Sequence, residues 1–121
     1  MSQTKFIEHK GKRILLMDFS NTHDKEQVMQ TVKDTVKLSE KEPLDSVYGF
    51  VDITGSSFDT DIAQALKELA KLNKPYMKIS AVAGVTGIKM VIYRSIIYFS
   101  GRKNIIVKNS REEALDWLAQ Q

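Results

Sequence analysis

The chain has 121 residues, of which 42% are apolar and 27% are charged, enough for one compact core with an ordinary solvated surface. Its formal net charge is +3, and lysines alternate with acids along most of the chain, which favours a solvated surface over a nucleic-acid-binding stripe. The absence of cysteine excludes disulfides, thiolate metal sites and cysteine nucleophiles, and is compatible with a reducing compartment.

Periodicity and turn residues predict five strands and four helices. In chain order we expect strands over 5–9 and 13–19, a helix from Asp24 to about Glu40, a strand over 46–53, a helix marked by Ile62, Leu66 and Leu69, a strand over 77–83, a helix over 86–100, a strand over 104–107 and a closing helix through Leu118.

Two helix starts carry residue types typical of capping boxes. Asp24 is followed three residues later by Gln27, and Ser110 is followed at the same spacing by Glu113. In such a box the first side chain accepts a hydrogen bond from the third backbone amide, and the third side chain reaches back. These pairs predict helices that begin directly after Asp24 and Ser110.

The alternation of strands and helices predicts an α/β fold with a mostly parallel sheet covered by helices. The opening pair of strands, joined by the turn at 10–12, adds an antiparallel edge hairpin, so the sheet is mixed. No linker or repeat interrupts the pattern, and we expect a single domain over residues 1–121. No apolar segment follows the first residues and no run of about 18 apolar residues occurs, so we expect no signal peptide, no membrane span and a cytoplasmic location.

This order of elements resembles the STAS domain of bacterial anti-sigma-factor antagonists and of anion-transporter tails. That family carries a Phe-x-Asp-Ser-Ser-Gly motif between its third strand and second helix, and the first serine is its phosphorylation site. The stretch 57–62 occupies this position: Asp59 matches the aspartate and Thr60 stands at the regulatory serine, whereas Asp61 replaces the second serine. The resemblance therefore implies a signalling module with a phosphorylation site at Thr60.

The second half is similar to an uncharacterised subgroup of SpoIIAA-like proteins. The similarity rests on Gly84-Val85-Thr86-Gly87, on Phe99-Ser100-Gly101-Arg102 and on Glu113-Ala114-Leu115-Asp116-Trp117-Leu118. Because that subgroup is also compared with Sec14-type lipid-binding domains, the resemblance implies that an apolar, anionic ligand of lipid type is one candidate.

The turn before the second helix supplies hydroxyl groups that could accept a phosphate. Thr60, with Ser56 and Ser57, lies near the expected helix start, where free N–H groups and the helix dipole stabilise negative charge. The alternative is plain capping, in which these residues close the turn and Asp59 and Asp61 would repel a phosphate.

The helix expected over 86–100 has two apolar stripes, whereas a surface helix needs only one. The first stripe comprises Val85, Ile88, Ile92, Ile96 and Phe99, and the second comprises Met90, Tyr93 and Ile97. A second stripe favours a protein partner, a second copy of the chain, or an apolar ligand. The alternative is a helix buried on both sides.

Basic residues surround this helix. Lys89, Arg94, Arg102 and Lys103 lie close to it in sequence, and the turn at 84–87 offers the N–H groups of Thr86 and Gly87. Together they could hold an anionic head group. The alternative is that the two glycines only form a tight connection between strand and helix.

Aspartates that follow two strands leave open a phosphate-accepting site of the receiver-domain kind. Asp18 and Asp52 end strands, Thr86 follows the next strand, and Lys108 follows the last. Such a site would use magnesium, held by oxygen ligands. The alternative is that these acids bond to the turns beside them.

No residue is nominated as catalytic. His9 and His23 lie in the first hairpin and the first loop without metal-ligand spacing, and neither a Gly-x-Ser-x-Gly elbow nor a phosphate-binding loop is present. We therefore predict a non-enzymatic binding or signalling module without metal, cofactor or nucleic acid. Its alternative is a phosphorylation-controlled switch at Thr60 or Ser57, followed by the receiver-like domain.

Overall fold

The computed structural model describes residues 4–56, 60–85, 90, 94, 101 and 104–121. Within these ranges the elements are β1 (Thr4–His9), β2 (Lys12–Asp18), α1 (Lys25–Ser39), β3 (Val47–Asp52), α2 (Thr60–Asn73), β4 (Met77–Ala83), β5 (Ile105–Lys108) and α4 (Arg111–Ala119).

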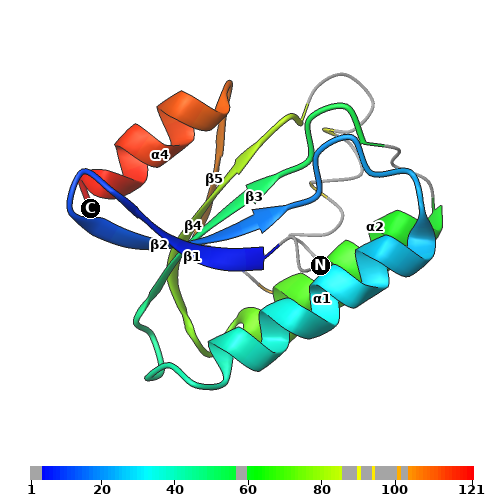
Figure 1. Cartoon of the computed structure of the whole chain (residues 1–121), viewed down its shortest axis with the longest axis horizontal. Helices are drawn as coiled ribbons and strands as arrows, with labels where there is room; N and C mark the ends of the chain where they lie inside the picture. Colours follow the sequence, from blue (N-terminus) through cyan, green and yellow to red (C-terminus); the bar gives the residue numbers. More distant parts are fainter. Residues whose placement is uncertain (1–3, 57–59, 86–89, 91–93, 95–100, 102–103) are drawn as a thin grey trace.

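The five strands form one sheet in the order β1-β2-β3-β4-β5 (Figure 1). β1 pairs antiparallel with β2, and every following pair is parallel. The carboxyl ends of β2, β3, β4 and β5 therefore meet at one edge, where Asp18, Asp52, Ala83 and Lys108 stand in register. The predicted α/β fold with an N-terminal edge hairpin is confirmed.

Helices α1 and α2 cover one face of the sheet (Figure 1). The larger core lies between them and the strands, and we call it the α1–α2 core. It includes Met17 and Phe19 from the second strand region, Val32 from α1, Leu66 from α2 and Val82 from β4. The valines and leucines whose spacing predicted these helices are the residues that pack on the sheet.

Helix α4 covers the opposite face with a smaller core. Leu115 and Leu118 pack against Phe50 of β3 and against Ala81 and Ala83 of β4. The two alanines leave room for the helix to approach the sheet closely. Because both faces are covered, the inner strands are continuous apolar runs rather than alternating ones.

The predicted helix starts agree with the structure in part. Asp24 caps α1, but its side chain accepts the amide of Glu26 rather than that of Gln27. Ser110 caps α4 and accepts the Glu113 amide at 3.1 Å, as expected. Three helices are described rather than four, since most of the helix expected over 86–100 lies outside the described residues; Met90 and Arg94 are helical.

Candidate functional site

The carboxyl ends of β2 and β3 carry two matching turns. In Asp18-Phe19-Ser20, Asp18 Oδ1 accepts the Ser20 amide at 3.0 Å and its hydroxyl at 2.5 Å. In Asp52-Ile53-Thr54, Asp52 Oδ1 accepts the Thr54 amide at 3.0 Å and its hydroxyl at 2.6 Å. Both acids therefore bond to the turns beside them, which was the alternative to a receiver-like site.

Arg111, the first residue of α4, joins the two turns. Its Nε and Nη2 atoms donate to Asp52 Oδ2 at 2.9 and 2.8 Å, and Nη2 lies 3.3 Å from Asp18 Oδ2. The Asp52 side chain is 6% exposed, whereas that of Asp18 is 31% and that of Arg111 is 43% exposed. We call this arrangement the Arg111 tie, because it fastens the start of α4 to the ends of two strands.

The surrounding groups favour the ionised forms of Asp18 and Arg111. Burial by itself raises the pKa of Asp18, but hydrogen bonds from Ser20 and the charge of Arg111 outweigh it and hold this pKa below its usual value. The hydrogen bond to Asp52 raises the pKa of Arg111 further, against a smaller opposing effect of desolvation. Asp18 and Arg111 are therefore both charged near neutral pH.

Glycine allows the loops at this edge to pack closely. Gly84 follows β4 with φ of +92°, and a Cβ placed there would lie 2.4 Å from the Thr54 amide nitrogen. The backbone also continues the strand pairing, because Phe19 donates to the Asp52 carbonyl at 2.8 Å. The strand-to-helix turn predicted at 84–87 thus has a structural need for its first glycine.

The phosphorylation candidates are located unequally. Thr60 is the first residue of α2, at a helix N-terminus as the sequence predicted. Ser56 is 8% exposed and its hydroxyl donates to the Ile53 carbonyl at 2.7 Å, so an enzyme would have to open the turn to reach it. Ser57 lies outside the described residues.

Most candidates on or beside the helix expected over 86–100 also lie outside the described residues. These are Thr86, Gly87, Lys89, Tyr93, Ile97 and Arg102. Of the other two, Arg94 is exposed, whereas Met90 is half-buried and packs against the α1–α2 core. The methionine side chain therefore has at least part of its contacts inside the protein.

Helix α4 and the residues after it make three further polar contacts with the β1–β2 hairpin. Asp116 Oδ1 lies 2.8 Å from His9 Nε2 and 2.9 Å from Lys10 Nζ, and Lys12 Nζ donates to the Gln121 carbonyl at 3.1 Å. Hydrogen bonds from His9 and Lys10 lower the pKa of Asp116. His9, whose position in the sequence indicated no metal-ligand role, thus helps to hold α4.

Arg111 is the site residue that sequence reasoning missed. A cation at the first position of a helix opposes the helix dipole, so it indicates a carboxylate partner nearby. The two strand-end segments with Asp followed two residues later by Ser or Thr were the available partners. Only the packing of α4 against the sheet brings residues 18, 52 and 111 together.

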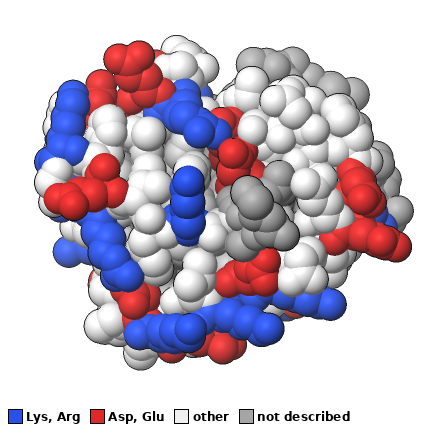
Figure 2. All heavy atoms as spheres, viewed as in Figure 1, with Lys and Arg blue, Asp and Glu red and all other residues white. Residues whose placement is uncertain are grey.

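Within the described ranges, no group of three or more His, Cys, Asp or Glu side chains is arranged to hold a metal ion. No helix in the same ranges is long and apolar enough to cross a membrane. Basic and acidic side chains alternate over the face shown in Figure 2.

Comparisons with known proteins support the fold rather than a detailed function. No protein-family model matches the chain, and no curated protein matches its sequence. Among solved structures, an anti-sigma-factor antagonist (STAS) domain protein from Planctomyces limnophilus superposes with a TM-score of 0.64 at 12% identity. The match covers 98% of this chain and 99% of that one. The chain therefore has the fold of the STAS domains.

Proposed function

We propose that this chain is a non-catalytic STAS-type binding or signalling module, with residues 1–121 acting as one domain. The observation that carries the proposal is the Arg111 tie. In open α/β sheets ligands usually bind outside the carboxyl ends of the strands. Here the acids at that edge are structural: Asp52 accepts two hydrogen bonds from Thr54 and two from Arg111.

The recognition surface in this proposal is the helix over 85–100, which would bind a protein partner, a second copy of the chain, or an apolar anionic ligand. Its support is the second apolar stripe in the sequence, with Tyr93 and Ile97, and the exposure of Arg94. An exposed arginine beside an apolar stripe suits a partner that offers both an apolar surface and a negative charge.

Native mass spectrometry of the gently purified protein tests this proposal. We expect a dimer, a bound protein partner or a copurified ligand mass, and we expect Tyr93→Lys or Ile97→Asp to abolish it without unfolding the chain. Leu44→Asp is the matched control, because Leu44 is 70% exposed at the end of the molecule where α1 returns to β3. A bare monomer for the unmodified chain, or equal loss in all three variants, would contradict the proposal.

A phosphorylation-controlled switch is the second candidate, favoured by the position of Thr60 at the start of α2. A phosphate there would meet free backbone N–H groups and the positive end of the helix dipole. Intact and fragment mass analysis of the protein isolated from its own cells should find a phosphoryl group at Thr60 or Ser57. Unmodified protein under every growth condition tried would remove this candidate.

A further inference from the structure

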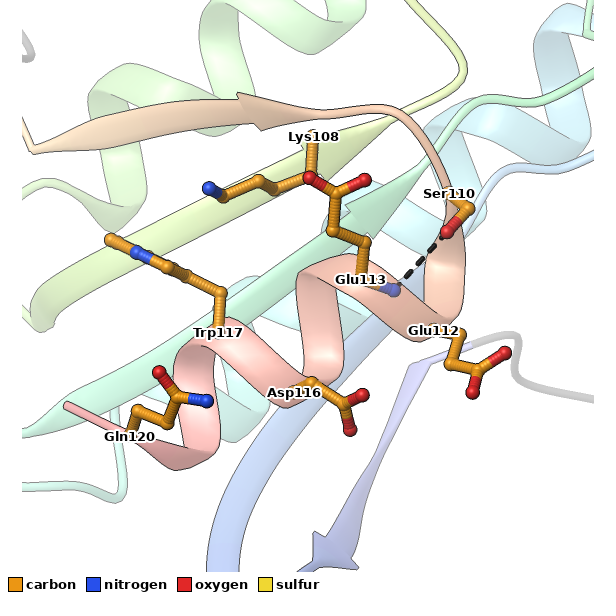
Figure 3. A pocket seen from close by; sticks show the side chains of 7 residues that line it. All are labelled: Lys108, Ser110, Glu112, Glu113, Asp116, Trp117 and Gln120. Atoms are coloured by element: carbon orange, nitrogen blue, oxygen red, sulfur yellow. Dashed lines mark hydrogen bonds between the residues drawn. The ribbon is translucent and has the colours of Figure 1, made fainter.

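A groove runs between α4 and the edge strand β5, on the face of the sheet opposite the α1–α2 core (Figure 3). It is shallow and open, with a volume of about 440 Å³. Lys108 of β5 and Glu113, Trp117 and Gln120 of α4 are among its lining residues. Nothing in the function proposed above uses it.

The groove presents an aromatic ring beside a cation. Trp117 is the only tryptophan of the chain and is half-buried. The Lys108 ammonium lies 5.3 Å from the centre of its ring, near the outer limit of a cation–π contact. Lys108 makes no ion pair among the described residues. A cation that binds the ring more tightly could therefore displace the Lys108 ammonium, with the loss of only this weak contact.

Acids surround the same groove. Glu112, Glu113 and Asp116 contribute three carboxylates against the single lysine, although the chain as a whole has a net charge of +3. Asp116 is already bonded to the hairpin, but Glu112 and Glu113 are exposed and have no ion-pair partner within the described part of the chain.

The Glu113 side chain does not complete the capping box at the start of α4 within the described residues. In a complete capping box this side chain would reach back to the Ser110 amide. Among the described residues only the forward bond is formed, from the Glu113 amide to the Ser110 hydroxyl. In Figure 3 the Glu113 side chain rises from α4 on the side of Lys108 and Trp117. A carboxylate free of its cap thus stands near Lys108, on the side of α4 that also carries the indole ring.

We propose that this groove docks an arginine-containing segment of a partner protein, with the guanidinium on the Trp117 ring and paired to Glu113. A planar guanidinium can stack on an indole and bond to a carboxylate at the same time, which an ammonium does less well. Ile106 lies two residues before Lys108 on the same side of β5 and is 38% exposed, so it extends the apolar surface for the arginine stem.

The groove lies on the face of the sheet opposite the α1–α2 core, against which Met90 packs, so the two proposals are tested separately. Peptide binding at Trp117 should be unchanged by Tyr93→Lys, whichever way the native mass spectrum turns out. Failure at one surface therefore says nothing against the other.

The single tryptophan allows a direct measurement. We would titrate the full chain with a short end-blocked peptide that carries two arginines and follow Trp117 fluorescence, with calorimetry in parallel. The control peptide has citrulline in place of arginine, which keeps the shape and removes the charge. We expect saturable binding of the arginine peptide only, weakening as salt is raised because the charges are exposed.

Variants locate the binding. The double change Glu112→Gln with Glu113→Gln should weaken binding by about fivefold, as expected for loss of exposed ionic contacts. Lys108→Met should strengthen it by roughly two- to threefold, because the competing cation is removed. Glu68→Gln is the matched control, since Glu68 is an exposed acid on α2, on the other face. Thermal unfolding confirms that each variant is folded.

Four results would overturn the proposal, three of them from the titrations. One is the absence of saturable binding, and another is equal binding of the citrulline peptide. The third is binding that the glutamate double variant leaves unchanged. If sedimentation instead shows a dimer whose formation quenches Trp117 and excludes the peptide, the occupant is a second copy of the chain and the partner-segment proposal is wrong.

Discussion

The contribution of the Arg111 tie to the free energy of unfolding can be measured by removing its cation. Arg111→Leu keeps the aliphatic stem but leaves Asp52, with 6% of its side chain exposed, without its two charge-assisted hydrogen bonds. Breaking a fully buried ion pair costs about 3–5 kcal/mol, whereas an exposed pair contributes about 0.2–1 kcal/mol. Arg111 is 43% exposed, so water partly replaces it. We therefore expect the free energy of unfolding to fall by about 2 kcal/mol.

Urea denaturation followed by Trp117 fluorescence is the assay, because the reporter lies on α4 itself. Far-UV circular dichroism on the same samples shows whether α4 detaches before the rest of the chain unfolds. A loss of 2 kcal/mol would lower Tm by roughly 10 °C for a chain of this size.

A double-mutant cycle isolates the pair. Asp52→Asn alone should also destabilise the protein, because the new amide group faces the guanidinium with a donor. When Arg111→Leu is added to it, the second change should cost about 1–2 kcal/mol less than it does in the unmodified chain. A cost below about 0.5 kcal/mol for Arg111→Leu, or no coupling between the two changes, would refute the view that this tie holds α4 to the sheet.

Three other predictions rest on the same edge of the sheet. Gly84→Ala should lower the free energy of unfolding, measured by urea denaturation, by at least about 2 kcal/mol, because its Cβ would meet the Thr54 backbone. Gly11→Ala, with φ of +82° but open space around it, should lower it clearly less. Equal losses would contradict the steric reason. Because the pKa of Asp18 is lowered, its contribution to stability is present above about pH 4 and is lost as pH falls through the folded-state pKa. The free energy of unfolding of Asp18→Asn should therefore fall less steeply with acidification than that of the unmodified chain. An equally steep fall in both proteins would count against this reasoning. Magnesium with acetyl phosphate should not label Asp52, whose two oxygens accept four hydrogen bonds, and labelling seen by mass spectrometry would revive the receiver-like interpretation.

The sequence by itself was sufficient for the order of the elements and for the fold class. Valines at 28, 32 and 36 predicted α1 because an apolar residue on every turn of a helix makes a face that must be buried. The continuous apolar run from Ile14 to Met17 predicted the second strand of the opening hairpin, and Ser110 predicted the start of α4. Each of these signals lies within or directly beside a single helix or strand, so it can be read from neighbouring residues alone.

The site depended on contacts between residues far apart in the chain. Asp52 and Arg111 are 59 positions apart, and nothing local to either one identifies the other. The sequence predicted that Asp18 and Asp52 end strands, but only the parallel pairing of β2 with β3 sets Asp18 beside Asp52. The groove at Trp117 likewise arises where α4 crosses the sheet beside β5. The sequence determined which elements form, whereas the tertiary structure decided which side chains meet, because the pairing of strands and the docking of α4 are set by burial on both faces of the sheet at once.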